Sequence, residues 1–166
     1  TKSGDFLKQP IEDFEDGFAL KFYSAVRLSK AVWPTLSKNK GWIVSINGAM
    51  SHSPDPFFMV GGAVNAAFLN FTKALSKRGL VDGVNVNSIN PGMTSTDRLI
   101  TIIQNNADRE GISFVDAEKN ALKNIGLDRF STPEEVAELT YFLCDPKVRH
   151  LTGTEINLDG GKKQTI

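Results

Sequence analysis

The segment Ser51-His52-Ser53 places an imidazole between two hydroxyl groups. An imidazole titrates near neutral pH, so His52 is a candidate proton donor, although a loop histidine is also commonly exposed to solvent. Adjacent positions do not make a nucleophile–base pair, because the side chains must converge in space. The sequence contains no Gly-x-Ser-x-Gly nucleophile elbow, which argues against a hydrolase.

A second unusual segment is the apolar stretch 57–71, FFMVGGAVNAAFLNF, which has no ionisable side chain. Its glycine pair, Gly61 and Gly62, falls inside a helical pattern and not between a strand and a helix. The pair is therefore not a phosphate-binding loop. Asn65 adds an amide to these apolar surroundings, so the segment predicts a helix that is buried on more than one side.

These segments lie in a chain where strand-like runs alternate with helical patterns. The runs rich in β-branched residues are 41–46, 83–89 and 153–161. The helical patterns are 14–37, 57–77, 97–107, 114–124 and 133–143. Such alternation indicates an α/β fold with a parallel sheet between two layers of helices. Three strands make a small parallel sheet, so we expect a neighbouring half-sheet to be absent from this chain or to be supplied elsewhere.

Three residues predict where helices end or bend. Pro34 predicts a kink or a break in the last turn of 14–37. Gly79 can adopt the left-handed conformation that closes the helix starting near residue 57. Thr132 is followed by Pro133 and Glu135, which predicts a capping box at the start of the last helix.

The composition limits the function classes. At 166 residues the chain predicts one domain, 1–166, and its 19 basic and 19 acidic residues give no net charge. Nucleic acids and anionic membranes are therefore not expected partners. The single cysteine, Cys144, and the absence of a Cys/His cluster predict no disulfide within the chain, no structural metal and a reducing cytoplasm. The longest apolar run is too short to span a bilayer.

Five motifs follow one another along the chain. In order they are GWIVSI, NAAFLNFTKALS, VNVNSINPGMTSTDRL, RFSTPEEVAELTYFLCD and LTGTEINLDGG. Together, over about residues 14–161, they resemble the C-terminal two-thirds of a short-chain dehydrogenase/reductase. The resemblance implies a three-layer, Rossmann-type, doubly wound parallel sheet whose N-terminal half is absent from this chain. It also implies NAD or NADP as cofactor, with the phosphate-binding loop outside this chain.

The resemblance further implies hydride transfer between nicotinamide and a carbonyl or alcohol substrate. In this family a tyrosine gives the proton, a lysine holds the ribose, a serine orients the oxygen and an asparagine assists a proton relay. Here the tyrosine and serine positions carry Gly61 and Gly48, the lysine position carries Asn65, and the asparagine position carries Lys21. All four positions therefore depart from the family pattern.

The exchange of asparagine and lysine suggests that the same pair still meets on facing helices. Lys21 would then hold the nicotinamide ribose or act as the acid, with Asn65 beside it. Alternatively, Lys21 is a solvated helix residue and Asn65 a satisfied polar group. The resemblance places His52 in a loop that borders the substrate.

The segment NPGMTSTD keeps the family pattern. By resemblance, Pro91, Gly92, Thr94 and Thr96, together with Asn65, contact the nicotinamide end of the cofactor. Thr96 can equally cap the following helix. Residues 97–125 correspond to the family's substrate lid, where Arg98 either meets an acidic substrate or is exposed to solvent.

Two functions from different classes remain open at this point. The first is an NAD(P)-dependent oxidoreductase with an atypical catalytic set. The alternative is a non-catalytic relative that binds a dinucleotide or a partner subunit. In either case, the apolar helices 14–37 and 57–77 predict a homodimer or homotetramer.

Overall fold

The structure is a computed structural model and describes residues 1–162. Its main elements are α1 (Ile11–Gly17), α2 (Ser24–Asn39), β1 (Trp42–Ile46), α3 (Met59–Asp82), β2 (Asn85–Pro91), α4 (Asp97–Glu110), α5 (Phe114–Ile125), α6 (Pro133–Leu143) and β3 (Glu155–Leu158). A π-helical segment, Phe18–Tyr23, joins α1 to α2. None of the helices within the described part is long and apolar enough to cross a membrane.

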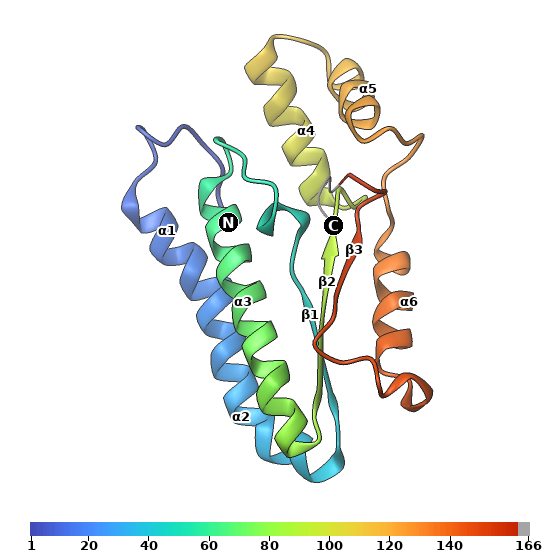
Figure 1. The fold of residues 1–166 in the computed structure, drawn as a ribbon. Coiled ribbons are helices and arrows are strands. Elements are labelled where there is room, and N and C mark those ends of the chain that lie inside the picture. Colours follow the sequence, from blue (N-terminus) through green and yellow to red (C-terminus); the bar gives the residue numbers. More distant parts are fainter. Residues whose placement is uncertain (163–166) are drawn as a thin grey trace.

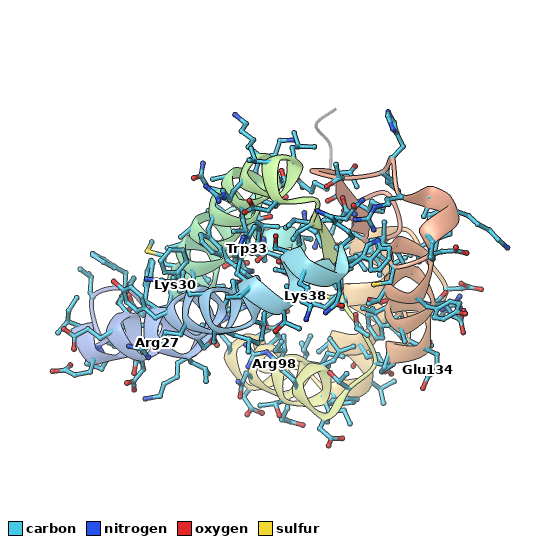
Figure 2. The ribbon with its side chains drawn as sticks, turned by 90° about the horizontal axis from the view of Figure 1, so that it is seen from below. Arg27, Lys30, Trp33, Lys38, Arg98 and Glu134 are labelled. Carbon is cyan, nitrogen blue, oxygen red and sulfur yellow. The ribbon has the colours of Figure 1, made fainter. Side chains whose placement is uncertain are left out.

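The three strands form one parallel sheet in the order β1-β2-β3. Figure 1 shows α1, α2 and α3 on one side of the sheet and α6 on the other, and the end-on view in Figure 2 agrees. Helices α4 and α5 lie beyond the carboxyl ends of the strands. The predicted three-layer α/β fold is therefore confirmed. Within residues 1–162, no strand pairs with the outer edge of β1.

Helix α3 packs along the sheet and begins near the carboxyl end of β1. Its buried residues recur three to four positions apart: Val60, Gly61, Val64, Asn65, Phe68, Thr72, Ser76 and Gly79. This spacing follows one face of the helix. The opposite face, including Ala63 and Ala66, is exposed. In the single chain only one face is buried, so the prediction that this helix is buried on more than one side is wrong.

The predicted closure of this helix at Gly79 is also wrong. Helix α3 continues to Asp82, and Gly83 ends it in the left-handed conformation with φ of 74°. Gly79 serves packing instead, because a Cβ there would lie 2.2 Å from the backbone oxygen of Val84. The glycine lets the end of α3 approach the start of β2.

The first helical region is longer than predicted and runs without a break through Pro34 to Asn39. The predicted break in its last turn is therefore wrong. Strand β2 begins two residues later than predicted, at Asn85, and β3 is limited to Glu155–Leu158. The capping box of Thr132 and Glu135 is confirmed.

Two asparagines of β2 fix the segment that leads into β3. Asn85 Nδ2 donates to the carbonyl of Arg149 at 2.6 Å, and Asn87 Nδ2 donates to that of Leu151 at 2.9 Å. Asn87 Oδ1 accepts the N–H of Thr154 at 3.2 Å. These buried amides pair backbone groups that lie outside the regular ladder.

Arg149 links the segments that precede β1 and β2, at the amino-terminal end of the sheet. Its guanidinium donates to the carbonyls of Lys40 at 2.7 Å and Gly83 at 2.6 Å and lies 4.8 Å from the ring centroid of Trp42. We expect Arg149→Ala to lower the free energy of unfolding by about 2 kcal/mol, because two charge-assisted hydrogen bonds and a cation–π contact are lost. Urea denaturation measures this. The exposed Lys30, changed to Ala, is the control, and equal effects of the two changes would contradict the prediction.

Candidate active site

A cavity of about 1450 Å³ opens at the carboxyl ends of β1 and β2, below α4. Among the residues singled out in the sequence, those that line it include Lys21, Asn65, Pro91, Gly92, Thr94 and Thr96. The cavity also extends along the outer edge of β1, so its volume exceeds that of a small-molecule pocket alone. The fold therefore gathers residues that are up to 75 positions apart, from 21 to 96.

Lys21 enters this cavity from the π-helical segment Phe18–Tyr23. Single π-helical turns inside α-helices are rare and occur often at functional sites. The Ser24 hydroxyl bonds the backbone carbonyls of Leu20 and Lys21 at this turn. The local widening of the helix therefore coincides with the residue that supplies the cation.

The Lys21 ammonium contacts two oxygen atoms. It donates to Asn65 Oδ1 at 2.5 Å and to the carbonyl of Asn47 at 2.9 Å. An ammonium has three N–H groups, so one remains with no partner among residues 1–162. The predicted meeting of Lys21 and Asn65 on facing helices is present in the structure.

Asn47 and Gly48 complete the immediate surroundings of Asn65. Asn47 Nδ2 donates to the backbone carbonyl of Asn65 at 3.0 Å. A Cβ at position 48 would lie 2.8 Å from Asn65 Nδ2, so Gly48 leaves room for the amide. The glycine at 48 and the asparagine at 65 are therefore sterically matched.

Gly61 is matched to an aromatic ring in the same way. A Cβ at this position would lie 2.0 Å from both Cε1 and Cζ of Phe58. The Phe58 ring thus fills the space that a side chain at 61 would enter, and it lines the cavity. The sequence patterns did not single out Phe58, because this contact is visible only after the first turn of α3 is folded.

Burial, with a smaller contribution from the positive charge of Arg98, lowers the pKa of Lys21 from its ordinary value to about 8. The Phe68 ring, whose centroid is 5.9 Å from the ammonium, is part of this apolar environment. A group with a pKa near 8 exchanges protons readily at physiological pH. Lys21 is therefore suited to proton donation.

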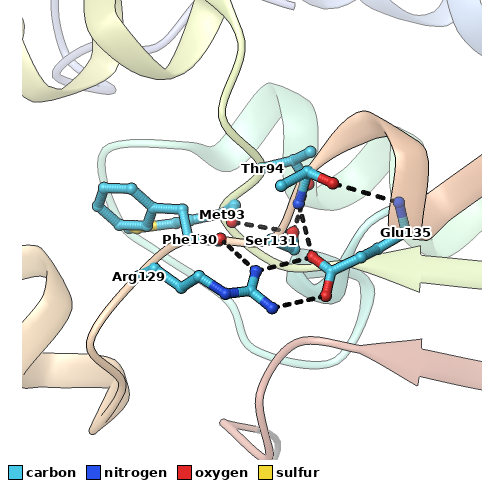
Figure 3. A network of polar contacts seen from close by, with 7 residues as sticks. Met93, Thr94, Arg129, Phe130, Ser131 and Glu135 are labelled. Atoms are coloured by element: carbon cyan, nitrogen blue, oxygen red, sulfur yellow. Dashed lines mark hydrogen bonds and ion pairs between the residues drawn. The ribbon is translucent and has the colours of Figure 1, made fainter.

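The segment that carries Thr94 is fixed by the loop before α6, as Figure 3 shows. The hydroxyls of Thr94 and Ser131 are 2.9 Å apart, and the Ser131 hydroxyl donates to the carbonyl of Met93 at 3.1 Å. Arg129 forms two hydrogen bonds with Glu135, at 2.8 and 2.9 Å, and these bonds together with the backbone N–H of Thr132 lower the pKa of Glu135 to about 2. The capping box of α6 thus supports one wall of the cavity.

The neighbouring residues of this wall follow the chain past the end of β2. Pro91 ends the strand, and a Cβ on Gly92 would lie 3.0 Å from Cα of Asp159, so the glycine permits a close backbone approach. Thr96 precedes α4 in an extended conformation, but its hydroxyl donates to the carbonyl of Thr94 at 3.3 Å. The predicted side-chain cap by Thr96 is therefore wrong.

A family model described as enoyl-(acyl carrier protein) reductase matches residues 1–163. The chain belongs to the short-chain dehydrogenase/reductase family. It is similar to the NADPH-dependent reductase BacG of Bacillus subtilis, with 29% identity over 157 residues, which cover 94% of this chain and 61% of that protein. It is also similar to D-β-hydroxybutyrate dehydrogenase of Rhizobium meliloti, with 30% identity over 155 residues, covering 92% of this chain and 60% of that protein.

Among solved structures, the chain is similar to YwfH, an NADPH-dependent reductase involved in bacilysin biosynthesis. The TM-score is 0.90 at 27% identity, over 99% of this chain and 63% of that chain. A short-chain dehydrogenase family protein of Francisella tularensis gives 0.87 at 28% identity, over 96% and 66%. The Rossmann-type fold is thereby confirmed. The chain spans about three fifths of the length of the curated relatives named above.

His52, the other candidate proton donor in this short-chain dehydrogenase/reductase chain, does not line the first cavity. Its Nε2 is 2.6 Å from Glu155 Oε1, and it lines a second cavity of about 520 Å³ together with Asn70 and Lys73. The structure does not bring His52 to Lys21 and Asn65. The pairing with Glu155 of β3 joins segments 103 positions apart, which no local sequence pattern indicates.

Proposed function

We propose that the protein of which this chain is part is an NAD(P)-dependent oxidoreductase that transfers hydride between nicotinamide and a carbonyl or alcohol. Lys21 takes the role of proton donor, and Asn65 positions it. The observation that carries the proposal is the Lys21 ammonium at the cavity wall, held by two oxygen atoms and retaining one N–H for a ligand. Relatives that are named as NADPH-dependent reductases support it.

The residues of the wall fit the nicotinamide end of such a cofactor. Pro91, Gly92, Thr94 and Thr96 line the cavity together with Asn65, and Gly92 keeps the wall free of a side chain. When bound, the cofactor supplies or accepts the hydride. We assign these residues to cofactor binding.

We assign the donation of the proton to side chains of this chain. As a carbonyl carbon gains hydride, its oxygen gains negative charge and requires a proton. The free N–H of Lys21 donates a hydrogen bond to that oxygen and then transfers the proton, which leaves a neutral amine and an alcohol. Asn65 Oδ1 and the Asn47 carbonyl hold the ammonium in place during the transfer.

The assembly and location belong to the same proposal. We infer one domain over 1–166 and a homodimer or homotetramer through 14–37 and 57–77, because the outer face of α3 and side chains such as Leu80 and Val81 are exposed in the single chain. The free thiol of Cys144 is compatible with a reducing cytoplasm.

The test of this function is turnover by the full-length protein. NADPH or NADH is mixed with a panel of carbonyl compounds, and the loss of nicotinamide absorbance is followed. We expect oxidation of the cofactor with at least one carbonyl, and the reverse reaction with the matching alcohol. Tight cofactor binding without turnover on the whole panel would contradict the proposal.

A further inference from the structure

One face of α4 forms the roof of the cavity. The residues of α4 that line it are Arg98, Leu99, Ile102, Asn105, Asn106 and Arg109. Positions three, four, seven and eleven apart share a helix face, so both arginines face the cavity, about 16 Å apart along the helix. Arg98 lies in the first turn of α4, and its positive charge contributes to the lowered pKa of Lys21.

Arg98 lies over the ring of Phe58, the residue that fills the space beside Gly61. Its guanidinium lies 5.9 Å from the ring centroid of Phe58 and donates one hydrogen bond to the carbonyl of Thr1 at 3.1 Å. Arg109 lies over the neighbouring ring of Phe57 at 4.6 Å. The Phe58 ring therefore occupies the space beside Gly61, and Arg98 lies over this ring at the cavity.

Lys21 and Arg98 have no carboxylate partner among residues 1–162. None of the ion pairs in this range includes either of them. The carboxylates that line the cavity each accept a backbone N–H: Asp5, Asp55 and Asp159. Two cations that line one cavity and have no carboxylate partner among the described residues form a site that favours an anion.

We propose that the carbonyl substrate carries an anionic group, a carboxylate or a phosphate, close to its reacting carbon, and that Arg98 binds this group. The inference rests on the proposed function. A guanidinium binds a carboxylate or phosphate through paired, charge-assisted hydrogen bonds. Arg98 is solvent-accessible, so a substrate can reach it. With the anion on Arg98, the free N–H of Lys21 remains for the carbonyl oxygen.

The test compares acids with their neutral esters on the full-length protein. Pyruvate, phenylpyruvate and acetoacetate are each measured beside their methyl esters, by NADPH turnover and by calorimetric binding. We expect at least one acid to be preferred, and Arg98→Gln to weaken that acid about 10- to 100-fold while leaving its ester unchanged. Lys119→Gln, an exposed change on α5, is the matched control and leaves both unchanged.

Three results would overturn the inference. One is a panel in which no acid is preferred to its ester. Another is an Arg98→Gln variant that weakens acid and ester equally. The third is a variant that weakens NADPH binding alone, which would assign Arg98 to the phosphates of the cofactor. Calorimetry needs no turnover, so acid binding that depends on Arg98 without hydride transfer would refute the proposed function and keep the anion site.

Discussion

Lys21→Met is expected to reduce kcat/KM for carbonyl reduction by roughly 10² to 10⁴, the usual contribution of a positioned general acid. The change removes the ammonium that contacts Asn65 and the Asn47 carbonyl while keeping a side chain of similar length. Steady-state kinetics on a carbonyl identified by the panel measures the loss. The affinity for the reduced cofactor, measured by fluorescence titration, should change much less than the rate.

The matched control is Lys30→Met, which removes an exposed lysine from the next helix, α2, where Figure 2 labels it. Circular dichroism shows whether both variants remain folded. A Lys21→Met protein that is folded and retains the rate of the Lys30→Met protein would remove Lys21 from the chemistry.

Gly79→Ala is expected to lower the free energy of unfolding by about 2 kcal/mol. A Cβ at this position would lie 2.2 Å from the backbone oxygen of Val84, and neither the helix nor the strand can yield as a flexible side chain would. The overpacking cost of about 3 kcal/mol outweighs the roughly 1 kcal/mol that alanine contributes over glycine inside a helix. Urea denaturation at equilibrium gives the difference.

Gly62→Ala, in the same helix, is expected to change the free energy of unfolding in the opposite direction. The nearest atom to its added Cβ is the carbonyl oxygen of Met50 at 3.6 Å, an ordinary contact. We expect this change to raise the free energy of unfolding by about 0.5 kcal/mol. Equal effects at 62 and 79 would show that helix propensity, and not the contact with β2, decides the outcome.

The parts of the fold that depend on neighbouring residues were predictable. The capping box of Thr132 and Glu135 requires residues three apart, and the alternation of strands and helices requires only local patterns. The end of α3 was not predictable, because Gly79 and Gly83 are equally permissive in sequence. Only the contact of Gly79 with Val84 makes it a packing glycine.

Some features of the candidate site were likewise predictable from the sequence, and others were not. The pairing of Lys21 with Asn65 followed from the family resemblance and not from spacing, since the two residues are 44 positions apart. The ring of Phe58 in the space beside Gly61 could not be predicted, because it depends on how the first turn of α3 packs. His52 was a reasonable candidate by residue type, but tertiary structure pairs it with Glu155.

The most direct test of Lys21 as proton donor is the pH dependence of kcat/KM, which reports the free enzyme. The pKa of Lys21 is about 8 because of burial and the charge of Arg98. Reduction requires the protonated form, so the rate should fall about tenfold per pH unit above pH 8. Alcohol oxidation requires the neutral amine and should instead rise up to that pH. We expect this decline in the wild-type protein and its absence from the residual activity of Lys21→Met. The same decline in both proteins would contradict it.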